Sequence, residues 1–286
     1  MVSSFYEIKT PRLVLKISVE DLDKLHIHEE IIPSILEWLV EKIRSDKVFK
    51  DPILVDEKTL VVLDGMHRVA AAKEIGFKYI PVCLVDYDNE SIELHAWGRV
   101  FVGGDWRQLV DAIKSIGFHV GELRSMEEGQ RLLSERKAVG VLVTPSDIYV
   151  VSSGENDIKR IYDQVKEVES ALEGRGFKIS YMTEKDSIDA VKSGKATASL
   201  IPPVITKDEV RRVALRGEVF THKATRHVIP ARPMNINVPL EWLTGEMPKD
   251  EVNRRVKGLL SSKRIMRLPP GTVLDRRYEE ELYVFE

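Results

Sequence analysis

The chain has 286 residues, of which 43% are hydrophobic and 31% are charged, and its formal net charge is −3. This composition is typical of a soluble globular protein and excludes a disordered one. The mildly acidic balance, with a pI near 6.2, argues against a broad basic surface for duplex nucleic acid. Because the length exceeds that of a usual single core, we expect two compact lobes.

The cysteine content and the hydropathy pattern indicate the cellular compartment that we expect for the protein. Cys83 is the only cysteine, so an internal disulfide is impossible, and we expect a buried thiol in a strand over 82–85. The chain has no cleavable signal pattern and no apolar run of about 18 residues, from which we expect a cytoplasmic protein that does not enter a membrane. Frequent Lys, Glu and Arg with little Gln favour a thermophilic source.

The first hundred residues alternate between helical and strand patterns. Apolar residues recur at helical spacing over 32–43, which predicts a helix with one buried face. Gly76 is expected to end a second helix. Strands are expected over residues 53–55, 59–63, 79–85 and 93–100. Together these elements predict an α+β lobe over 1–103, with Gly103 and Gly104 as a hinge.

The remainder of the chain is also mixed α/β. Periodicity predicts helices over 106–116 and 157–172, a hairpin of 139–143 with 148–151, and a strand over 177–182. Thr206 and Glu209 fit a capping box that opens another helix. We therefore expect a second lobe over 104–243 and a C-terminal extension over 244–286 that contains a helix near 250–260.

The five residues Asp64-Gly65-Met66-His67-Arg68 form the most informative motif. They follow a β-branched apolar run and precede a helix-forming stretch, so the loop should lie at a helix N-terminus, where unpaired N–H groups favour an anion. Gly65 would let a ligand approach the backbone, and Arg68 could hold two phosphate oxygens. The alternative is that His67 and Arg68 merely solvate a helix start.

Two further groups could carry chemistry. His28-Glu29-Glu30 precedes the first helix, so its carboxylates should lie in a loop or first turn and off the buried face. Glu29 or Glu30 could act as a general base, although an acid there can simply complement the helix dipole.

The segment from Thr221 to His227 concentrates hydrogen-bond donors between strand-like stretches, which favours an anion- or substrate-binding loop. Trp97 is a lone aromatic in a predicted strand. A core role is the default for it, although its face could also cover an ammonium group.

These residues resemble a known family. The Asp64 to Arg68 loop, with its helix to Gly76 and the strand Ile80-Pro81-Val82, resembles the ParB/sulfiredoxin-like fold. Within that superfamily the chain is most similar to the archaeal free L-serine kinases. The matching motifs lie between about residues 20 and 243, outside the C-terminal extension. They are His28-Glu29, the 64–68 loop, Trp97 with Phe101 and Gly103, Arg216 to Val219, Thr225 to Pro230, and Asn237-Val238.

The resemblance implies an enzyme that phosphorylates free L-serine to O-phosphoserine with ADP or ATP, in support of cysteine biosynthesis. It implies that Glu29 is the base and that Asp64, Gly65, Met66, His67 and Arg68 hold the phosphates, with Asp64 orienting the reacting groups or the metal. It also implies a serine pocket, in a cleft between the lobes, formed by Trp97, Thr225, Arg226 and His227. Mg²⁺ would be held mainly by the phosphates.

Met66 stands where relatives carry a histidine and where sulfiredoxins carry a reactive cysteine, so the resemblance does not extend to sulfinic acid repair. The alternative function is a ParB-type, nucleotide-dependent DNA-binding or regulatory protein without small-molecule kinase activity. The absence of an evident helix-turn-helix and of a basic surface weakens that alternative. No residue in the sequence decides between ADP and ATP, and none indicates the oligomeric state.

Overall fold

Two compact units make up the computed structural model, which describes residues 5–274 and 276–286. Unit 1 combines residues 1–93, 210–218 and 227–286, and unit 2 combines 94–209 and 219–226. The mixed α/β architecture expected from the sequence is confirmed. The chain passes between the units near strands β7 (Glu93–His95) and β14 (Arg226–Val228).

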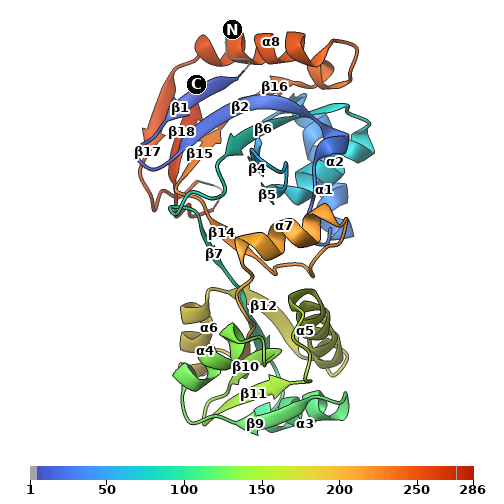
Figure 1. Ribbon diagram of the computed structural model, residues 1–286, viewed down its shortest axis with the longest axis vertical. Helices are drawn as coiled ribbons and strands as arrows, with labels where there is room; N and C mark the ends of the chain where they lie inside the picture. The colour runs from blue at the N-terminus through green and yellow to red at the C-terminus, as the bar shows by residue number, and fades with distance from the viewer. Residues whose placement is uncertain (1–4, 275) are drawn as a thin grey trace. The chain divides into compact units, whose positions relative to one another are not determined.

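Unit 1 is built on a five-stranded sheet of order β1-β2-β6-β4-β5, in which only the β4–β6 pair is parallel. A three-stranded sheet β15-β18-β17 (Figure 1) and a short β16–β3 pair complete it. The elements of this unit are β1 (Tyr6–Lys9), β2 (Val14–Asp21), η1 (Leu22–Lys24), α1 (Pro33–Asp46), β3 (Val48–Phe49), β4 (Ile53–Asp56), β5 (Val62–Asp64), α2 (Met66–Ile75), β6 (Tyr79–Val85), α7 (Lys207–Leu215, beginning in unit 2), β15 (Ala231–Met234), β16 (Val238–Pro239), η2 (Leu240–Leu243), α8 (Lys249–Ser261), β17 (Ile265–Leu268) and β18 (Glu281–Phe285).

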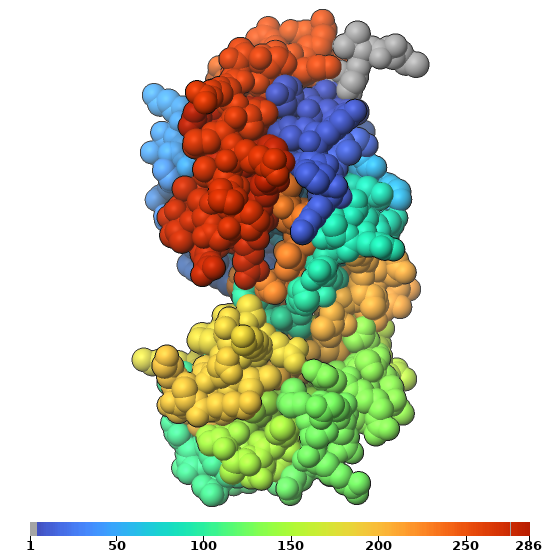
Figure 2. All heavy atoms as spheres, turned by 90° about the vertical axis from the view of Figure 1, so that its left-hand side faces the viewer, coloured from blue at the N-terminus to red at the C-terminus, as the bar shows by residue number. Residues whose placement is uncertain are grey.

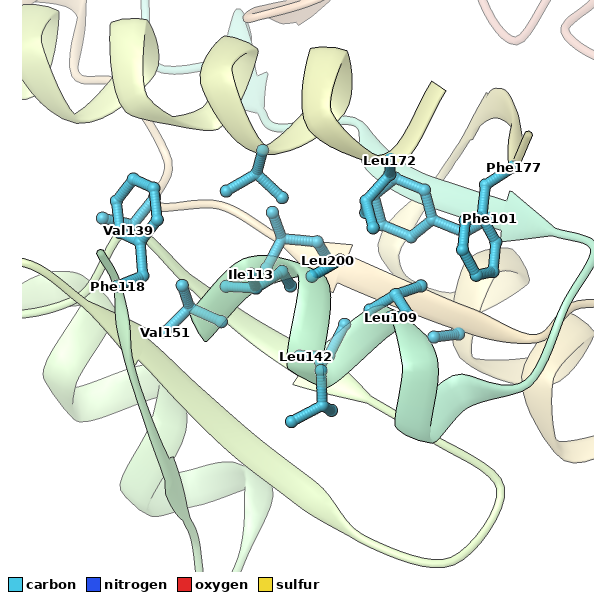
Figure 3. Packing of buried hydrophobic residues seen from close by; sticks show 14 of the residues in the cluster. Phe101, Leu109, Ile113, Phe118, Val139, Leu142, Val151, Leu172, Phe177 and Leu200 are labelled. Carbon is cyan, nitrogen blue, oxygen red and sulfur yellow. The ribbon is translucent and has the colours of Figure 1, made fainter. Parts of the chain in front are cut away.

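Unit 2 is a six-stranded sheet of order β12-β8-β13-β10-β11-β9, antiparallel throughout. Helices α3 and α5 bury Leu109, Ile113 and Leu172 against one face (Figure 3), and α4 and α6 pack on the other. The elements are β8 (Gly98–Val102), α3 (Trp106–Ser115), β9 (His119–Glu122), α4 (Met126–Ser134), β10 (Gly140–Val143), β11 (Ile148–Ser152), α5 (Ile158–Glu173), β12 (Lys178–Met182), α6 (Glu184–Lys192) and β13 (Ala198–Ile201).

The division of the chain differs from the three consecutive segments expected from the sequence. Residues 94–103 join unit 2 because β8 pairs with β12 and β13, so the chain leaves unit 1 before Gly103. Residues 244–286 belong to unit 1 because α8 lies along β1 and β2 and β18 pairs with β15. Figure 2 shows this segment in red beside the blue N-terminal strands. It is an integral part of unit 1.

Three local expectations also need correction. The helix over 32–43 is confirmed as α1, but only Val40 and Ile43 on it are buried, and Trp38 is exposed. The strand expected over 59–63 begins only at Val62, because a turn with Leu60 at a φ of 58° precedes it. The strand over 93–100 is interrupted at Ala96 and Trp97, so Trp97 does not lie in a strand.

Candidate active site

The 64–68 loop joins the end of β5 to the start of α2, as the sequence predicts. Gly65 is the residue before the helix and has a φ of 101°. A Cβ atom there would lie 2.6 Å from Ile53 Cγ2 and 2.9 Å from Arg68 Nη2. Glycine is therefore required both by the backbone conformation and by the space. The loop delivers the first N–H groups of α2, which lack intrahelical acceptors, next to Asp64 and can receive an anion.

Asp64 is anchored by two arginines through a single oxygen. Its Oδ2 atom accepts hydrogen bonds from Arg68 Nη2 at 2.9 Å and from Arg232 Nη1 at 2.6 Å. No residue that the structure describes donates to Oδ1. Desolvation acts to raise the pKa of Asp64, but the charges of Arg232 and Arg68 outweigh it and hold the pKa well below its ordinary value. Asp64 is thus an ionised carboxylate with one unused oxygen.

The sequence reasoning missed Arg232. It lies on β15, far from Asp64 along the chain, and no local pattern marks it. Only the fold, which brings β15 into unit 1 beside the sheet that carries Asp64, reveals this contact.

The Arg68 guanidinium forms its hydrogen bonds with other residues of the protein. Besides Asp64, its guanidinium donates from Nη1 to the carbonyl oxygens of Asp51 and Pro52, at 2.8 and 2.9 Å. A planar guanidinium can hold these acceptors together because its donors are fixed in one plane. In this arrangement Arg68 shapes the loop from within, whereas the sequence suggested a fork open to two phosphate oxygens.

His28 and Glu29 lie in a loop before α1, as predicted, but both are buried, with exposed fractions of 0% and 7%. Both carboxylates lie outside the helix, as expected, but other parts of the fold bury Glu29, and Glu30 is half-buried. His28 Nδ1 donates to the carbonyl oxygen of Val62, two residues before Asp64, at 2.8 Å. This bond fastens the Glu29 segment to β5, the strand that ends at Asp64.

Two more histidines connect the parts of the candidate site within unit 1. His67 Nε2 accepts a hydrogen bond from the backbone N–H of Ile32 at 2.9 Å, which links the 64–68 loop to the residue before α1. The His227 ring meets the His28 ring edge to face, with centroids 5.4 Å apart. His227 Nε2 also lies 2.7 Å from the hydroxyl of Tyr87. The residues on either side of Glu29, His28 and Ile32, are therefore in direct contact with His227 and with the 64–68 loop.

The other predicted substrate residues, Trp97, Thr225 and Arg226, lie together in unit 2. Trp97 Nε1 donates to the carbonyl oxygen of Thr225 at 3.0 Å. The Arg226 guanidinium lies 5.8 Å from the Trp97 ring centroid, and the Lys223 ammonium lies 5.0 Å from it. Since Trp97 covers cations with its ring, it is more than an inert core residue.

The described residues include one buried cysteine and no preformed metal-binding group. Cys83 is fully buried in β6, as expected, and burial raises the pKa of its thiol to about 12. Within residues 5–274 and 276–286, no three His, Cys, Asp or Glu side chains gather as a metal-binding group. None of the helices in that part of the chain has the length and apolar character needed to cross a membrane.

Comparisons with known proteins show what the chain as a whole is similar to. No family model matches the chain. An ATP-dependent L-serine kinase of Staphylothermus marinus is 32% identical over 254 residues, which cover 82% of this chain and 96% of that protein. The ADP-dependent L-serine kinase SerK of Thermococcus kodakarensis is 29% identical over 227 residues, which cover 78% of this chain and 91% of that protein. A solved structure of a free serine kinase in complex with AMP superposes with a TM-score of 0.67 at 27% identity, covering 83% of this chain and 97% of that one.

Proposed function

The chain belongs to the family of ATP- and ADP-dependent L-serine kinases, and from this premise we propose that it transfers a phosphoryl group from a nucleotide to the hydroxyl of free L-serine. It is thus a phosphotransferase with an alcohol acceptor. The observation in its own structure that best supports this reaction is the burial of Glu29 between His28, which bonds to Val62 of β5, and Ile32, which bonds to His67 of the Asp64 loop.

Glu29 is the proposed general base. Phosphoryl transfer needs little covalent help from the protein, so the main tasks are to orient the nucleophile and to stabilise charge. A carboxylate fixed in a buried loop can accept the proton of the serine hydroxyl as the hydroxyl oxygen attacks the terminal phosphorus. The bond from that phosphorus to the bridging oxygen breaks, and AMP leaves from ADP or ADP leaves from ATP. The His28 bond to Val62 and the His67 bond to Ile32 restrain the segment on both sides of Glu29.

The 64–68 loop is the proposed phosphate site. Gly65, Met66, His67 and Arg68 bring the start of α2 to the phosphates through their backbone, and the dipole of that helix favours their negative charge. Asp64 is ionised and presents Oδ1, so it can orient a donor group of the substrates. Trp97, Thr225, Arg226 and His227 are the proposed serine-binding residues, with the Trp97 ring suited to an ammonium group and Arg226 to a carboxylate.

Mg²⁺ is the proposed companion of the nucleotide. Among the described residues no three His, Cys, Asp or Glu side chains gather as a metal-binding group, and we propose an ion held mainly by phosphate oxygens and water, with Asp64 Oδ1 as a suitable oxygen at the loop. When bound, the ion would neutralise the phosphate charges. ATP-dependent and ADP-dependent relatives match this chain at similar identity. The first experiment should therefore determine which nucleotide donates the phosphoryl group. We propose, as the resemblance implies, that the O-phosphoserine formed supports cysteine biosynthesis.

Phosphorus NMR of the purified protein with L-serine, Mg²⁺ and either ADP or ATP tests this function. We expect a phosphoserine signal together with AMP or ADP, and the nucleotide that supports it identifies the donor. Nucleotide binding without phosphoserine from either donor would contradict the proposal. It would then favour a ParB-type, nucleotide-dependent regulator, for which strongly salt-dependent DNA binding is the matching assay.

A further inference from the structure

The C-terminal segment reaches the candidate active site through Glu280. This residue directly precedes β18, and β18 pairs in parallel with β15, which carries Arg232. Arg232 Nε donates to Glu280 Oε1 at 2.7 Å, while Arg232 Nη1 donates to Asp64 Oδ2 at 2.6 Å. The side chains of Arg232 and Glu280 are only 12% and 11% exposed. One buried guanidinium therefore bridges the C-terminal segment and the acid of the 64–68 loop.

The bridge fixes the direction of Asp64. An arginine side chain loses much conformational freedom when it is held in one position, and a second acceptor on the same guanidinium offsets that cost. Glu280 supplies this acceptor and balances the charge of Arg232. The half-exposed Arg276 lies 3.5 Å from the same Glu280 oxygen and is the outer member of the cluster. With Oδ2 held by Arg68 and Arg232, the rotation of the Asp64 carboxylate is set and Oδ1 is presented to the loop.

We propose that Glu280 is a positioning residue of the kinase site, which acts by holding Arg232 against Asp64, so that the C-terminal segment is a working part of the active site. The inference rests on the proposed function. The motifs that carry the family resemblance end near residue 243, so Glu280 lies outside them.

Steady-state kinetics of Glu280→Ala and Glu280→Gln test the proposal, with Glu281→Ala as the matched control. Glu281 is the next residue, and its carboxylate contacts Arg267 and Tyr283 of the same segment. We expect Glu280→Ala to lower kcat about tenfold or more, because misplaced catalytic groups cost that much, with the KM for L-serine nearly unchanged. Glu280→Gln, which keeps an acceptor for Arg232, should recover part of the rate. Glu281→Ala should match the unsubstituted protein.

A double-mutant cycle on the dissociation constant of ADP distinguishes a positioning role of Glu280 from a purely structural one. If Glu280 acts through Asp64, Glu280→Ala should change the dissociation constant of ADP by about threefold or more in the native background and leave it unchanged with Asp64→Asn. Equal effects in both backgrounds would overturn the proposal, as would a folded Glu280→Ala variant with native kcat. If Glu280→Ala does not fold, the near-isosteric Glu280→Gln is measured instead. The proposal is overturned if Glu280→Gln has the native kcat and the native ADP affinity. A native protein that makes no phosphoserine defeats the proposed function, whereas the ADP cycle still tests Glu280.

Discussion

The backbone N–H of Ile32 donates a 2.9 Å hydrogen bond to Nε2 of His67. Ile32 directly precedes α1, and His67 supplies the acceptor for its backbone N–H. Because a backbone N–H can only donate, Nε2 carries no proton in this arrangement, and the neutral ring must carry its proton on Nδ1. The 64–68 loop and the Glu29 segment therefore share a bond that keeps a fixed spacing between the proposed phosphate site and the proposed base.

Replacement of Glu29 by Gln tests the base directly. The substitution keeps the size of the buried side chain and removes its ability to take a proton. We expect kcat to fall about 10²- to 10⁴-fold, while the dissociation constant of ADP, measured by calorimetry, stays close to the native value. A near-normal rate would remove Glu29 from the mechanism.

Glu30→Gln is the matched control, since Glu30 adjoins Glu29 in the same loop and is less buried. We expect this variant to keep most of its activity. The reverse result, a severe loss for Glu30→Gln and none for Glu29→Gln, would assign the base to Glu30. The sequence alone left that alternative open, and the burial of Glu29 now favours Glu29.

The substitution Arg68→Lys distinguishes two roles of Arg68, which are to hold the 64–68 loop in its conformation or to bind phosphate oxygens directly. A lysine keeps the charge but cannot reach Asp64 and the carbonyl oxygens of Asp51 and Pro52 together. We expect the free energy of unfolding, measured with urea, to fall by about 1.5–3 kcal/mol, as for the loss of charge-assisted hydrogen bonds. Native stability combined with weakened ADP binding would instead support the phosphate fork that the sequence suggested.

Local sequence signals predicted those parts of the fold whose causes are local. The strand Tyr79–Val85 agrees residue for residue with its prediction because a buried apolar run and a preceding glycine define it. Helix α2 begins after Gly65 and ends before Gly76, where glycines in the left-handed conformation suit both ends. The Thr206–Glu209 capping box is formed as expected, with the Glu209 N–H donating to Thr206 Oγ1 at 3.2 Å.

Long-range pairing could not be predicted in this way. The sequence marked Asp64 and Arg68 as members of one local motif, but Arg232 and Glu280 join Asp64 only through the fold, in which β15 pairs in parallel with β18. The burial of Glu29 has the same origin. A polar loop before a helix is usually exposed, and only the contacts of His28 with Val62 and His227 bring this one into the interior.

The burial of His28 predicts a specific pH dependence of stability. Burial lowers the pKa of His28 below its ordinary value of 6.5, against the opposing charge of Glu29. The unfolded chain therefore takes up a proton at this histidine at a higher pH than the folded chain does. The contribution of His28 to stability is complete above pH 6.5 and is lost as the pH falls below it, with a slope of at most about 1.4 kcal/mol per pH unit.

Urea unfolding of the native protein and of His28→Asn at several values between about pH 5 and 7 measures this slope. We expect the slope to be smaller in His28→Asn and to persist in His119→Asn, which changes an exposed histidine. If His28→Asn does not fold, proton NMR of the native protein serves instead. A His28 ring signal that titrates at or above pH 6.5 would contradict the prediction.

Asn253 tests whether the C-terminal helix is an integral part of unit 1. Strand β1 pairs with β2 as far as Ile17, which lies opposite Tyr6. Two residues further along β2, the Asn253 carboxamide bonds to the backbone of Val19. Its Oδ1 accepts from the backbone N–H of Val19 at 2.7 Å, and its Nδ2 donates to the Val19 carbonyl oxygen at 3.5 Å. At Val19 the amide thus makes the two hydrogen bonds that a neighbouring strand would make.

Asn253→Ala would leave the buried N–H of Val19 without its acceptor, which costs about 1–3 kcal/mol. We expect a loss of that size in the free energy of unfolding, without a change in the urea m-value, since the folded surface stays the same. Arg254→Ala is the control on the same helix, because its side chain is largely exposed and such substitutions change stability by about 0.5 kcal/mol or less. Equal stabilities of the two variants would show that α8 adds little to unit 1, and would weaken the case that the segment after it supports Asp64.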